Sequence, residues 1–348
     1  MNFFTFVSKD IGMDLGTSNI LLTIKGKGIV LNEPSVVAIN RQNNQIVATG
    51  HEAKEMLGRT PEQIRAVRPM KDGVIADFDI TQAMIRAFIK EADVSNVFKP
   101  RVVVCIPSGI TEVERRAVRP RVVVGVPSGI TEVEERAVEE AVTQAGAREV
   151  YLIEEPMAAA IGAGIDVAEP TGNMVVDIGG GTTEVAVISL GGIVVSDSIR
   201  VAGDTMDDEI INYIKNNLNL AVGGTTAEQV KLELGCAIPL VTQKSMEIRG
   251  RELTTGLPEN KIVTSEQVQE AMAPSIEKII DLVKATLEKT PPELASDIIE
   301  RGIVLTGGGA LLTGLDRLLE SELNVPVFVA DDALNCVANG CGVMLENL

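Results

Sequence analysis

Short apolar runs separated by glycine and proline recur along the chain and predict β-strands. Such runs cover residues 11–15, 20–24, 29–31, 35–39, 175–176, 185–188 and 303–306. Runs of this kind, bounded by turn residues, are typical of strands in a sheet. They fall into one group near the start of the chain and a second group beyond its middle.

Apolar residues at helical spacing predict two long helices. The first is expected after a capping pair formed by Asp79 and Gln82, and its apolar residues are Ile80, Met84, Ile85, Phe88 and Ile89. The second is expected over residues 264–289, where one apolar stripe consists of Val268, Met272, Ile276, Ile279, Ile280, Val283 and Leu287. We expect Pro274 near the first turn of that helix or at a kink, because proline lacks the backbone donor.

Two more polar stretches interrupt this pattern and predict smaller subdomains. Residues 40–65 are polar and mixed, and residues 203–262 are polar and helical in character. Strands followed by helices therefore occur twice along the chain. This organisation predicts an α/β protein of two lobes, and 348 residues are enough for two substantial cores.

Glycine-rich turns follow three of the predicted strands. They are Asp14-Leu15-Gly16-Thr17, Asp177-Ile178-Gly179-Gly180-Gly181-Thr182-Thr183 and Gly307-Gly308-Gly309. Glycine lets the backbone approach an anion closely, and successive N–H groups in such a turn form an anion-binding nest. Either acidic turn alone also fits an ordinary hairpin, whereas the pair together predicts two turns that clamp a polyphosphate.

The acidic residues of these turns point to a metal ion. Asp14 and Asp177 cannot bind phosphate directly, because like charges repel. We expect them to hold Mg2+ through water, since Mg2+ prefers oxygen ligands and keeps its own waters. The third turn lacks the following Lys-Ser or Lys-Thr of a P-loop. It follows a buried strand, and a helical stretch is expected to begin at Ala310-Leu311-Leu312. Strand, glycine turn and helix in this order are typical of a nucleotide-contacting loop.

The overall charge excludes one class of partner. The chain has a formal net charge of −18, whereas a nucleic-acid-binding protein needs a basic surface.

The single histidine, His51, argues against a histidine-based triad or zinc site, and we expect it at the surface. The cysteines, Cys105, Cys236, Cys336 and Cys341, lack metal-ligand spacing and are expected to be reduced and mostly buried.

The first residues are apolar, although no run of 18 or more apolar residues predicts a transmembrane helix. Phe3, Phe4 and Phe6 lie in a segment that is too short to span a bilayer and lacks a cleavage site. We expect this segment either to pack on its own lobe or to enter a bilayer surface.

A segment of 20 residues occurs twice in tandem. Residues 99–118 and 119–138 differ at only four positions, which are 99/119, 105/125, 106/126 and 115/135. Each copy encodes one strand and one helix start, but only the second continues into a full helix, expected over Glu132 to Ala145. Because two such strands cannot both fill one place in a sheet, we expect the second copy to supply strand and helix and the first to be an insertion.

Glu155 stands between a predicted strand and Pro156, which is expected to be a first helical residue. A carboxylate at this strand end can orient or deprotonate a water molecule that attacks a phosphate. The dipole of the helix would equally favour a carboxylate there. The residues alone leave both roles open.

The glycine turns and several other stretches resemble the MreB family of bacterial actin homologues over essentially the whole chain. The matching stretches are residues 10–17, 32–36, 68–77, 153–160, 176–184 and 290–309. The first two turns would also suit a heat-shock-70 chaperone ATPase or a sugar kinase, whereas residues 68–77 and 290–301 favour the MreB family. The family carries the strand–helix unit of residues 99–138 once, so the second copy is a departure.

The resemblance implies an actin-like α/β fold, with ATP and Mg2+ in a cleft between two lobes. Each lobe would have a core α/β subdomain and a smaller one. The implied boundaries are 8–36, 71–165 and 335–348 for the core of lobe I, 37–70 for its small subdomain, 166–205 and 263–334 for the core of lobe II, and 206–262 for its small subdomain.

The resemblance also implies which residues contact the nucleotide. These are Asp14, Gly16, Thr17, Ser18, Asn19, Asp177, Gly179, Gly180, Gly181, Thr182, Glu228, Gln229, Val230, Lys231, Gly307, Gly308, Gly309 and Ala310. Without the resemblance, Glu228 and Lys231 fit an ordinary charge pair on a solvated helix. Glu155 matches the catalytic glutamate of the family, and Thr182 would help to hold the attacking water.

The resemblance finally implies a polymer: a homopolymer of paired filaments, peripheral on the cytoplasmic face of the cell membrane, with slow polymerisation-linked ATP hydrolysis. Its partners would be transmembrane cell-elongation and wall-synthesis proteins, and its function the maintenance of rod shape. The membrane-inserting residues would be Phe3, Phe4, Phe6, Val97 and Phe98. The alternative is a heat-shock-70-like or sugar-kinase-like nucleotidase, but we locate neither a substrate domain nor sugar-binding loops.

Overall fold

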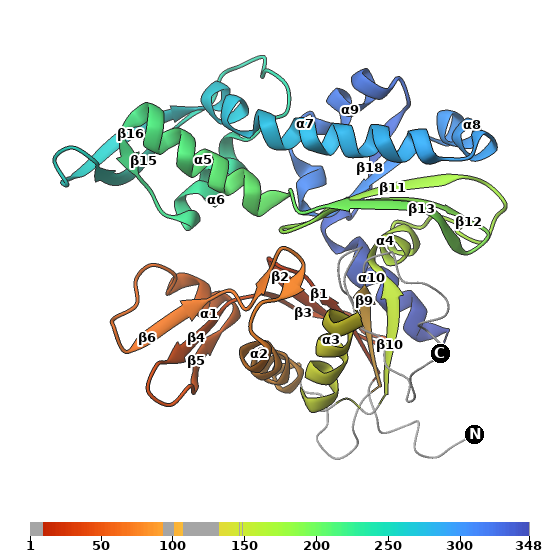
Figure 1. The fold of residues 1–348 in the computed structure, drawn as a ribbon, viewed down its shortest axis with the longest axis horizontal. Coiled ribbons are helices and arrows are strands. Elements are labelled where there is room, and N and C mark those ends of the chain that lie inside the picture. The colour runs from red at the N-terminus through yellow and green to blue at the C-terminus, as the bar shows by residue number, and fades with distance from the viewer. Residues whose placement is uncertain (1–9, 93–100, 107–131, 146, 148, 348) are drawn as a thin grey trace.

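The computed structural model describes residues 10–92, 101–106, 132–145, 147 and 149–347. In this part of the chain two lobes face each other, each built on a five-stranded sheet (Figure 1). The predicted α/β architecture of two lobes is therefore confirmed. Phe3, Phe4, Phe6, Val97 and Phe98 lie outside the described residues.

The sheet of lobe I has the strand order β10-β9-β1-β2-β3. Its strands are β1 (Ile11–Leu15), β2 (Asn19–Ile24), β3 (Gly28–Pro34), β9 (Arg101–Ile106) and β10 (Glu149–Glu154). β1 pairs antiparallel with β2 and parallel with β9. Helices α2 (Phe78–Glu91) and α3 (Glu132–Ala145) pack on this sheet, and Met13, Phe88 and Val142 share one buried core.

A smaller sheet belongs to the same lobe and has the order β5-β4-β6. Its elements are β4 (Val37–Asn40), β5 (Ile46–Thr49), β6 (Ile64–Val67) and helix α1 (Gly50–Glu55), and the short hairpin of β7 (Met70–Lys71) and β8 (Val74–Ile75) follows. Val36, Ala38, Ala48 and Ala53 form a separate small core there. His51 is exposed, as predicted, and its Nδ1 lies 2.9 Å from Glu33 Oε2.

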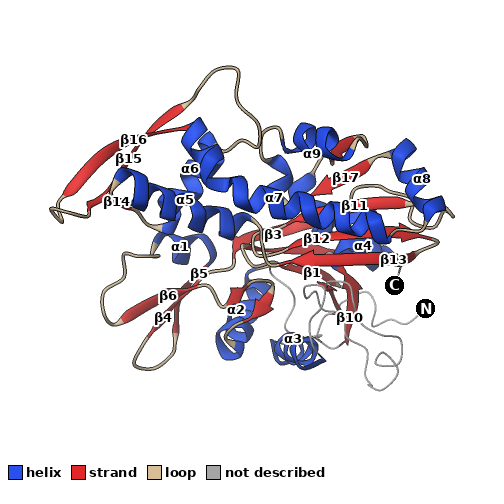
Figure 2. Cartoon of the chain, turned by 45° about the horizontal axis from the view of Figure 1, so that its top comes forward, coloured by secondary structure: helices blue, strands red, loops and turns tan. Residues whose placement is uncertain are grey.

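The sheet of lobe II has the order β13-β12-β11-β17-β18. Its strands are β11 (Asn173–Ile178), β12 (Thr183–Ser189), β13 (Gly192–Ile199), β17 (Ile303–Thr306) and β18 (Val327–Val329). Helix α7 (Ser265–Lys289) lies along one face (Figure 2), and α8 (Pro292–Arg301) and α9 (Leu315–Leu323) complete this part of the lobe. Val176 and Val187 pack toward α7, whereas Val175 and Ile188 pack into the core on the opposite face.

The smaller part of lobe II combines helices with strands. Its helices are α5 (Gly203–Leu218) and α6 (Gly224–Leu234), and its strands are β14 (Leu220–Ala221), β15 (Ser245–Glu252) and β16 (Pro258–Thr264). The expectation that residues 203–262 are helical is therefore wrong for the second half of this stretch. β15 and β16 form an antiparallel hairpin in which inward apolar residues such as Ile248 alternate with exposed ones, a period of two rather than 3.6.

Two helices connect the lobes. α4 (Glu155–Gly162) leads from β10 of lobe I to β11 of lobe II, and α10 (Cys336–Glu346) returns from lobe II to pack on β1 and β2. A Cβ on Gly340 would clash with the Ala158 carbonyl, and a Cβ on Gly162 would clash with the Cys336 carbonyl. The two helices therefore touch backbone to backbone, as only glycine allows at these positions.

The two tandem copies divide the strand–helix unit between them. β9, the strand between β1 and β10, comes from the first copy, and α3 comes from the second copy with the predicted bounds. Our expectation that the second copy supplies the strand is therefore wrong. A physical reason lies in the sequence: the first copy has Cys105 and Ile106 where the second has Gly125 and Val126, and glycine weakens a strand interior. Residues 107–131 lie outside the described residues.

Three local expectations need correction. The cap of α2 is Asp77, whose side chain accepts a hydrogen bond from the Ile80 amide at 3.2 Å, and Asp79 lies inside the first turn, where the helix dipole favours an acid. α7 begins with a capping box of Thr264 and Gln267, so Pro274 lies in its interior. The first-turn alternative for Pro274 is therefore wrong, and the kink stays a prediction. The stretch after the third glycine turn is only a 3-10 turn, η3 (Gly308–Leu311), and α9 begins later.

Candidate functional site

The first two glycine turns touch each other between the lobes. The first turn joins β1 to β2, and the second joins β11 to β12. A Cβ on Gly180 would clash with the Ser18 hydroxyl, and a Cβ on Gly181 would lie 2.7 Å from Thr17 Oγ1. The structure thus brings together two turns that are 160 or more residues apart in sequence, as the paired-turn prediction requires.

Neighbouring segments of lobe I hold the first turn in place. The Ser35 hydroxyl donates to the Gly16 carbonyl at 2.6 Å, and the Ser35 amide donates to the Ser18 carbonyl at 2.9 Å. Thr17 Oγ1 accepts a hydrogen bond from the Gly73 amide at 2.9 Å. The Thr17 hydroxyl therefore positions the β7–β8 hairpin over the turn and is partly engaged already.

The second turn continues directly into lobe II. The Gly179 amide donates to the Thr182 carbonyl at 2.9 Å, which closes the turn. The carbonyls of Gly179 and Gly180 accept hydrogen bonds from the first amides of α5, Gly203 at 3.2 Å and Asp204 at 2.7 Å. A displacement of this turn is thus passed on to α5.

The third turn lies beside the second because β17 pairs in parallel with β11. Gly307 has φ +80°, and a Cβ there would clash with the backbone of Ile178. Its amide donates to the Ala333 carbonyl at 2.7 Å. Glycine is therefore required at this position for both its conformation and its close approach.

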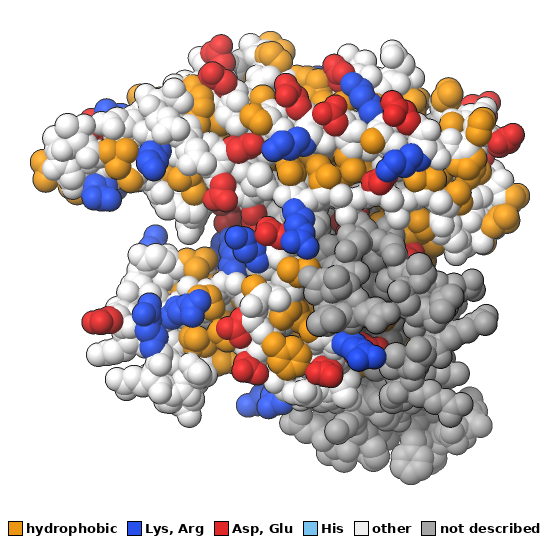
Figure 3. Space-filling view, viewed as in Figure 1, with side chains coloured by type: hydrophobic (Ala, Val, Ile, Leu, Met, Phe, Trp, Pro, Cys, Tyr) orange, Lys and Arg blue, Asp and Glu red, His pale blue; other side chains and the backbone are white. Residues whose placement is uncertain are grey.

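A cavity of about 380 Å³ lies among the three turns, and Figure 3 shows the surface hollowed between the two lobes. This volume is within the range of small-molecule sites. The predicted residues that line it are Asp14, Gly16, Thr17, Ser18, Asn19, Glu155, Asp177, Gly179, Gly180, Gly181, Thr182, Glu228, Lys231, Gly307, Gly308 and Gly309. Three predicted residues lie elsewhere: Val230 and Ala310 are buried in the core of lobe II, and Gln229 bonds to Glu233.

Carboxyl groups gather on the floor of this cavity. Burial, together with the charge of Asp177, raises the pKa of Asp14 to about 7. Burial also raises the pKa of Asp177 to about 6, although a hydrogen bond from the Thr306 hydroxyl at 2.8 Å opposes this rise. Burial and then the charges of Asp14 and Asp177 raise the pKa of Glu155 well above its ordinary value. A cation would relieve the repulsion within this cluster.

Glu184 belongs to the same cluster and was not among the predicted site residues. It lies opposite Asp177 on the neighbouring strand and is 1% exposed. Burial raises its pKa well above the ordinary value, and the charges of Glu155, Asp177 and Glu154 add to the effect. A charged residue directly before the apolar run Val185–Ile188 of a predicted strand is a signal that sequence reasoning had available.

Leucine side chains line the opposite part of the cavity. Leu232, Leu311 and Leu334 all border it, and they are 76%, 61% and 48% exposed. Apolar side chains left open to a cavity are suited to the flat face of an aromatic ring. Sequence reasoning missed all three, because single exposed leucines have no distinctive pattern.

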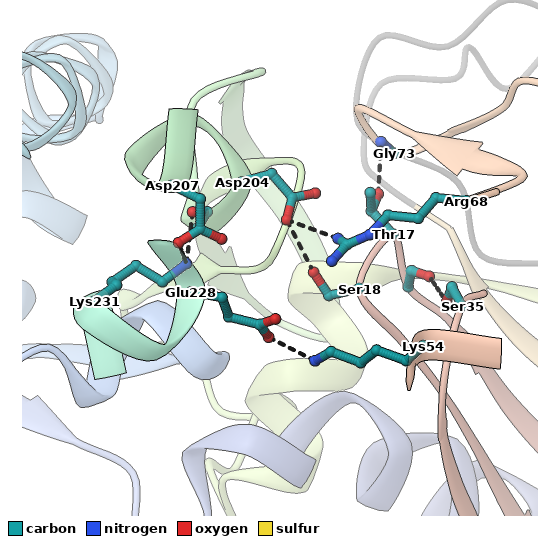
Figure 4. Close-up of polar contacts among 12 residues, drawn as sticks. Thr17, Ser18, Ser35, Lys54, Arg68, Gly73, Asp204, Asp207, Glu228 and Lys231 are labelled. Atoms are coloured by element: carbon teal, nitrogen blue, oxygen red, sulfur yellow. Dashed lines mark hydrogen bonds and ion pairs between the residues drawn. The ribbon is translucent and has the colours of Figure 1, made fainter. Parts of the chain in front are cut away.

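Lys231 and Glu228 also line the cavity, and each has a charged partner (Figure 4). Lys231 Nζ lies 2.9 Å from Asp207 Oδ1 and donates to the Gly203 carbonyl at 2.7 Å. Burial raises the pKa of Asp207 to about 6, although Lys231 opposes the rise. Glu228 Oε1 lies 2.8 Å from Lys54 Nζ, which belongs to the other lobe. The charge pair of Glu228 with Lys231, which was the alternative to nucleotide contact, is therefore replaced by two different ion pairs.

Three further observations concern metal ligands, membrane-spanning helices and cysteines in the described residues. Among them, no three Asp, Glu, Cys or His side chains are arranged to enclose a metal ion directly. No helix in the described ranges is long and apolar enough to cross a membrane. Cys236, Cys336 and Cys341 are free and buried, as expected of three of the four cysteines.

Comparison with known proteins identifies the family to which the chain belongs. The MreB/Mbl protein family matches residues 8–120 and 118–348, so the two matches meet at the junction of the tandem copies. The cell shape-determining protein Mbl of Bacillus cereus is 51% identical over 342 residues, which are 98% of this chain and 97% of that protein. The cell shape-determining protein MreB of Escherichia coli is 53% identical over 346 residues, 97% of this chain and 94% of that protein.

A solved structure supports the fold as well. The crystal structure of MreB5 of Spiroplasma citri bound to AMPPNP has a TM-score of 0.88 and 39% identity, and the match covers 98% of this chain and 96% of that one. The fold is therefore actin-like, as the resemblance implied. With the family matched over nearly all of its length, the chain is a member of the MreB/Mbl family.

Proposed function

We propose that the chain binds ATP with Mg2+ in the cavity between its lobes and polymerises into filaments that determine cell shape. The observation that carries the proposal is the contact of Gly180 and Gly181 with Ser18 and Thr17 above a cluster of buried carboxyl groups. Membership of the MreB/Mbl family and the cell shape-determining relatives support the cytoskeletal role. These relatives favour the cytoskeletal role over the alternative of a chaperone or sugar-kinase-like nucleotidase.

The three turns divide the nucleotide among them in this proposal. Backbone amides near Gly16 and Gly180 face the phosphates, and Gly307 to Gly309 lie beside the base and sugar. The exposed leucines Leu232, Leu311 and Leu334 offer an apolar slot to the base. The relative of 39% identity that is bound to AMPPNP supports nucleotide binding by this chain.

Asp14 and Asp177 would hold the Mg2+ ion. Burial raises the pKa of both carboxyl groups, and the charge of Asp177 adds to the rise at Asp14. A bound divalent cation would favour the charged form of both groups. When bound, the ion supplies charge neutralisation for the phosphates. Thr306 keeps Asp177 in position through its hydrogen bond.

Glu155 would act as the base in slow hydrolysis. It starts α4 at the floor of the cavity, and Thr182 lines the same cavity from the second turn. Glu155 would accept a proton from the attacking water, while Thr182 holds that water in line with the terminal phosphate. Burial, and then the charges of Asp14 and Asp177, raise the pKa of Glu155, so its carboxylate holds a proton more tightly than an ordinary glutamate does.

Filaments of this chain would lie as paired strands on the inner face of the cell membrane and recruit transmembrane elongation and wall-synthesis proteins. We further propose the four-subdomain division stated above, which the separate small sheets of both lobes support. Sedimentation with and without Mg-ATP, followed by electron microscopy of the pellet, tests polymerisation. Protein that binds ATP yet stays in the supernatant at all concentrations would contradict the filament role.

A further inference from the structure

Two ion pairs cross between the lobes outside the phosphate-binding turns. Lys54, on α1 of lobe I, lies with Nζ 2.8 Å from Oε1 of Glu228, on α6 of lobe II. Arg68, which precedes β7 in lobe I, lies with Nη1 3.1 Å from Oδ1 of Asp204, at the start of α5 in lobe II. Figure 4 shows both pairs reaching across from one lobe to the other.

Asp204 connects three parts of the site. Its carboxylate accepts from Arg68 and, at 3.4 Å, from the Ser18 hydroxyl of the first turn. Its backbone amide donates to the Gly180 carbonyl of the second turn at 2.7 Å. Arg68 is therefore coupled through a single residue to both turns that would hold phosphate.

These ion pairs lie where separation of the lobes would both break them and open the cavity. The helices that connect the lobes, α4 and α10, lie on one side of the contact between lobes, whereas α1 and α6 lie on the other (Figure 1). Separation of the lobes about the connecting helices would therefore break the Lys54–Glu228 pair. Glu228, Lys231 and Ser18 all line the cavity, so the same motion would open it.

We propose that the Lys54–Glu228 and Arg68–Asp204 pairs form a latch that controls how readily the lobes separate, and thereby how fast nucleotide enters and leaves. The part that concerns nucleotide rests on the proposed function. The four side chains are between 25% and 33% exposed. Pairs with this much solvent contact hold weakly and respond to salt, which suits a latch that must open repeatedly.

Exchange of the two charges in the Lys54–Glu228 pair tests the latch. Lys54→Glu and Glu228→Lys each replace attraction by repulsion, and the double exchange restores opposite charges. We expect each single variant to release a fluorescent ADP analogue about two- to fivefold faster, as a pair of this exposure allows, and the double variant to approach the unmodified rate. Equal rates in all four proteins, or faster release in the double than in either single variant, would overturn the proposal.

A second measurement needs no nucleotide. Spin labels on Gln42→Cys and Asn260→Cys report the separation of the lobes. Both positions are exposed; Gln42 lies in the turn between β4 and β5 of lobe I, and Asn260 lies in β16 of lobe II. We expect Lys54→Glu to lengthen or broaden the distance distribution of nucleotide-free protein, and Arg68→Gln to add to the effect. An unchanged distribution in both variants would refute the latch.

The two measurements separate failure of the latch from failure of the proposed function. If the unmodified chain binds no ADP analogue, ATP binding is refuted, and the distance measurement still decides whether the pairs hold the lobes. If Glu228 instead only contacts nucleotide, Lys54→Glu leaves both the release rate and the distance unchanged, and the double exchange rescues nothing.

Discussion

Gly181 lies so close to Thr17 that a Cβ on the glycine would be 2.7 Å from the threonine Oγ1. The same Cβ would be 3.1 Å from the Cα of Asp72 and from the Gly73 amide nitrogen. Three segments from two lobes therefore meet at a point where the backbone has no room for a side chain. The packing of the two turns, rather than either turn alone, sets the shape of the proposed phosphate site.

Gly181→Ala should therefore push the turns apart. We expect Mg-ATP affinity to fall at least about tenfold, because displaced amides lose charge-assisted hydrogen bonds to phosphate. Titration calorimetry measures the change. Gly192→Ala is the matched control, since a Cβ there would meet nothing closer than 3.8 Å. Equal affinities in the two variants would contradict the packed-turn account.

Asp14→Asn should stabilise the protein without ligand and weaken Mg-ATP binding. The pKa of Asp14 is about 7, well above the ordinary 3.8, so the folded state binds its proton more tightly than the unfolded state. The associated stability is present at acid pH and lost as pH rises through about 7. Removing the charge should therefore raise the free energy of unfolding at pH 8 by about 1–3 kcal/mol, since one pKa unit corresponds to about 1.4 kcal/mol.

Urea unfolding of nucleotide-free protein at pH 5 and pH 8 checks the direction of this change in the free energy of unfolding. The difference between Asp14→Asn and the unmodified chain should be larger at pH 8 than at pH 5. With Mg-ATP present the unmodified chain should instead be the more stable protein, because the carboxylate of Asp14 would help to hold the cation and an asparagine amide would not. A variant that is less stable at pH 8 without ligand would show that Asp14 is stabilised as a carboxylate there.

Glu155→Gln should bind ATP normally and release phosphate far more slowly. Loss of a general base typically costs about 10²–10⁴-fold in rate. Glu184→Gln is the control, because Glu184 contributes charge to the same cluster but is absent from the residues that line the cavity. We expect a loss of less than about tenfold there, since only the environment of Glu155 changes. Similar losses in both variants would assign the effect to the cluster as a whole.

The sequence predicted those turns and helices that depend on a local pattern of residues. Strand–glycine–strand motifs located Asp14, Asp177 and the turns, and helical spacing located α2, α3 and α7. It could not predict how distant segments pair across space. The Lys54–Glu228 contact joins residues 174 positions apart and leaves no local trace, and the leucines around the cavity look like ordinary surface residues.

Membrane binding should depend on apolar insertion rather than on charge. We expect flotation with liposomes to survive raised salt, because a net charge of −18 does not favour anionic lipid. Changing Phe3, Phe4, Phe6, Val97 and Phe98 to serine should abolish flotation. As a control, the same number of exposed polar residues on α7 can be changed to serine. Full retention of binding by the five-residue variant would refute the assignment.

The tandem copies offer a final test of why β9 comes from the first copy. Deleting residues 99–118 keeps the strand sequence of the second copy, whereas deleting residues 107–126 keeps that of the first. Both deletions leave one strand–helix unit, as in the family, and the products differ only at positions 99, 105 and 106. We expect both to fold, to bind ATP and to be more soluble than the full chain.

The two deletion proteins should nevertheless differ in stability. The protein lacking 107–126 keeps Cys105 and Ile106, whereas the other has glycine and valine at these strand positions. Glycine in a strand interior and the loss of one methylene together predict about 1–2 kcal/mol in favour of the former. Urea unfolding of the pair measures the difference directly. Equal stabilities would mean that strand propensity does not select the copy, and that its covalent link to α2 does so instead.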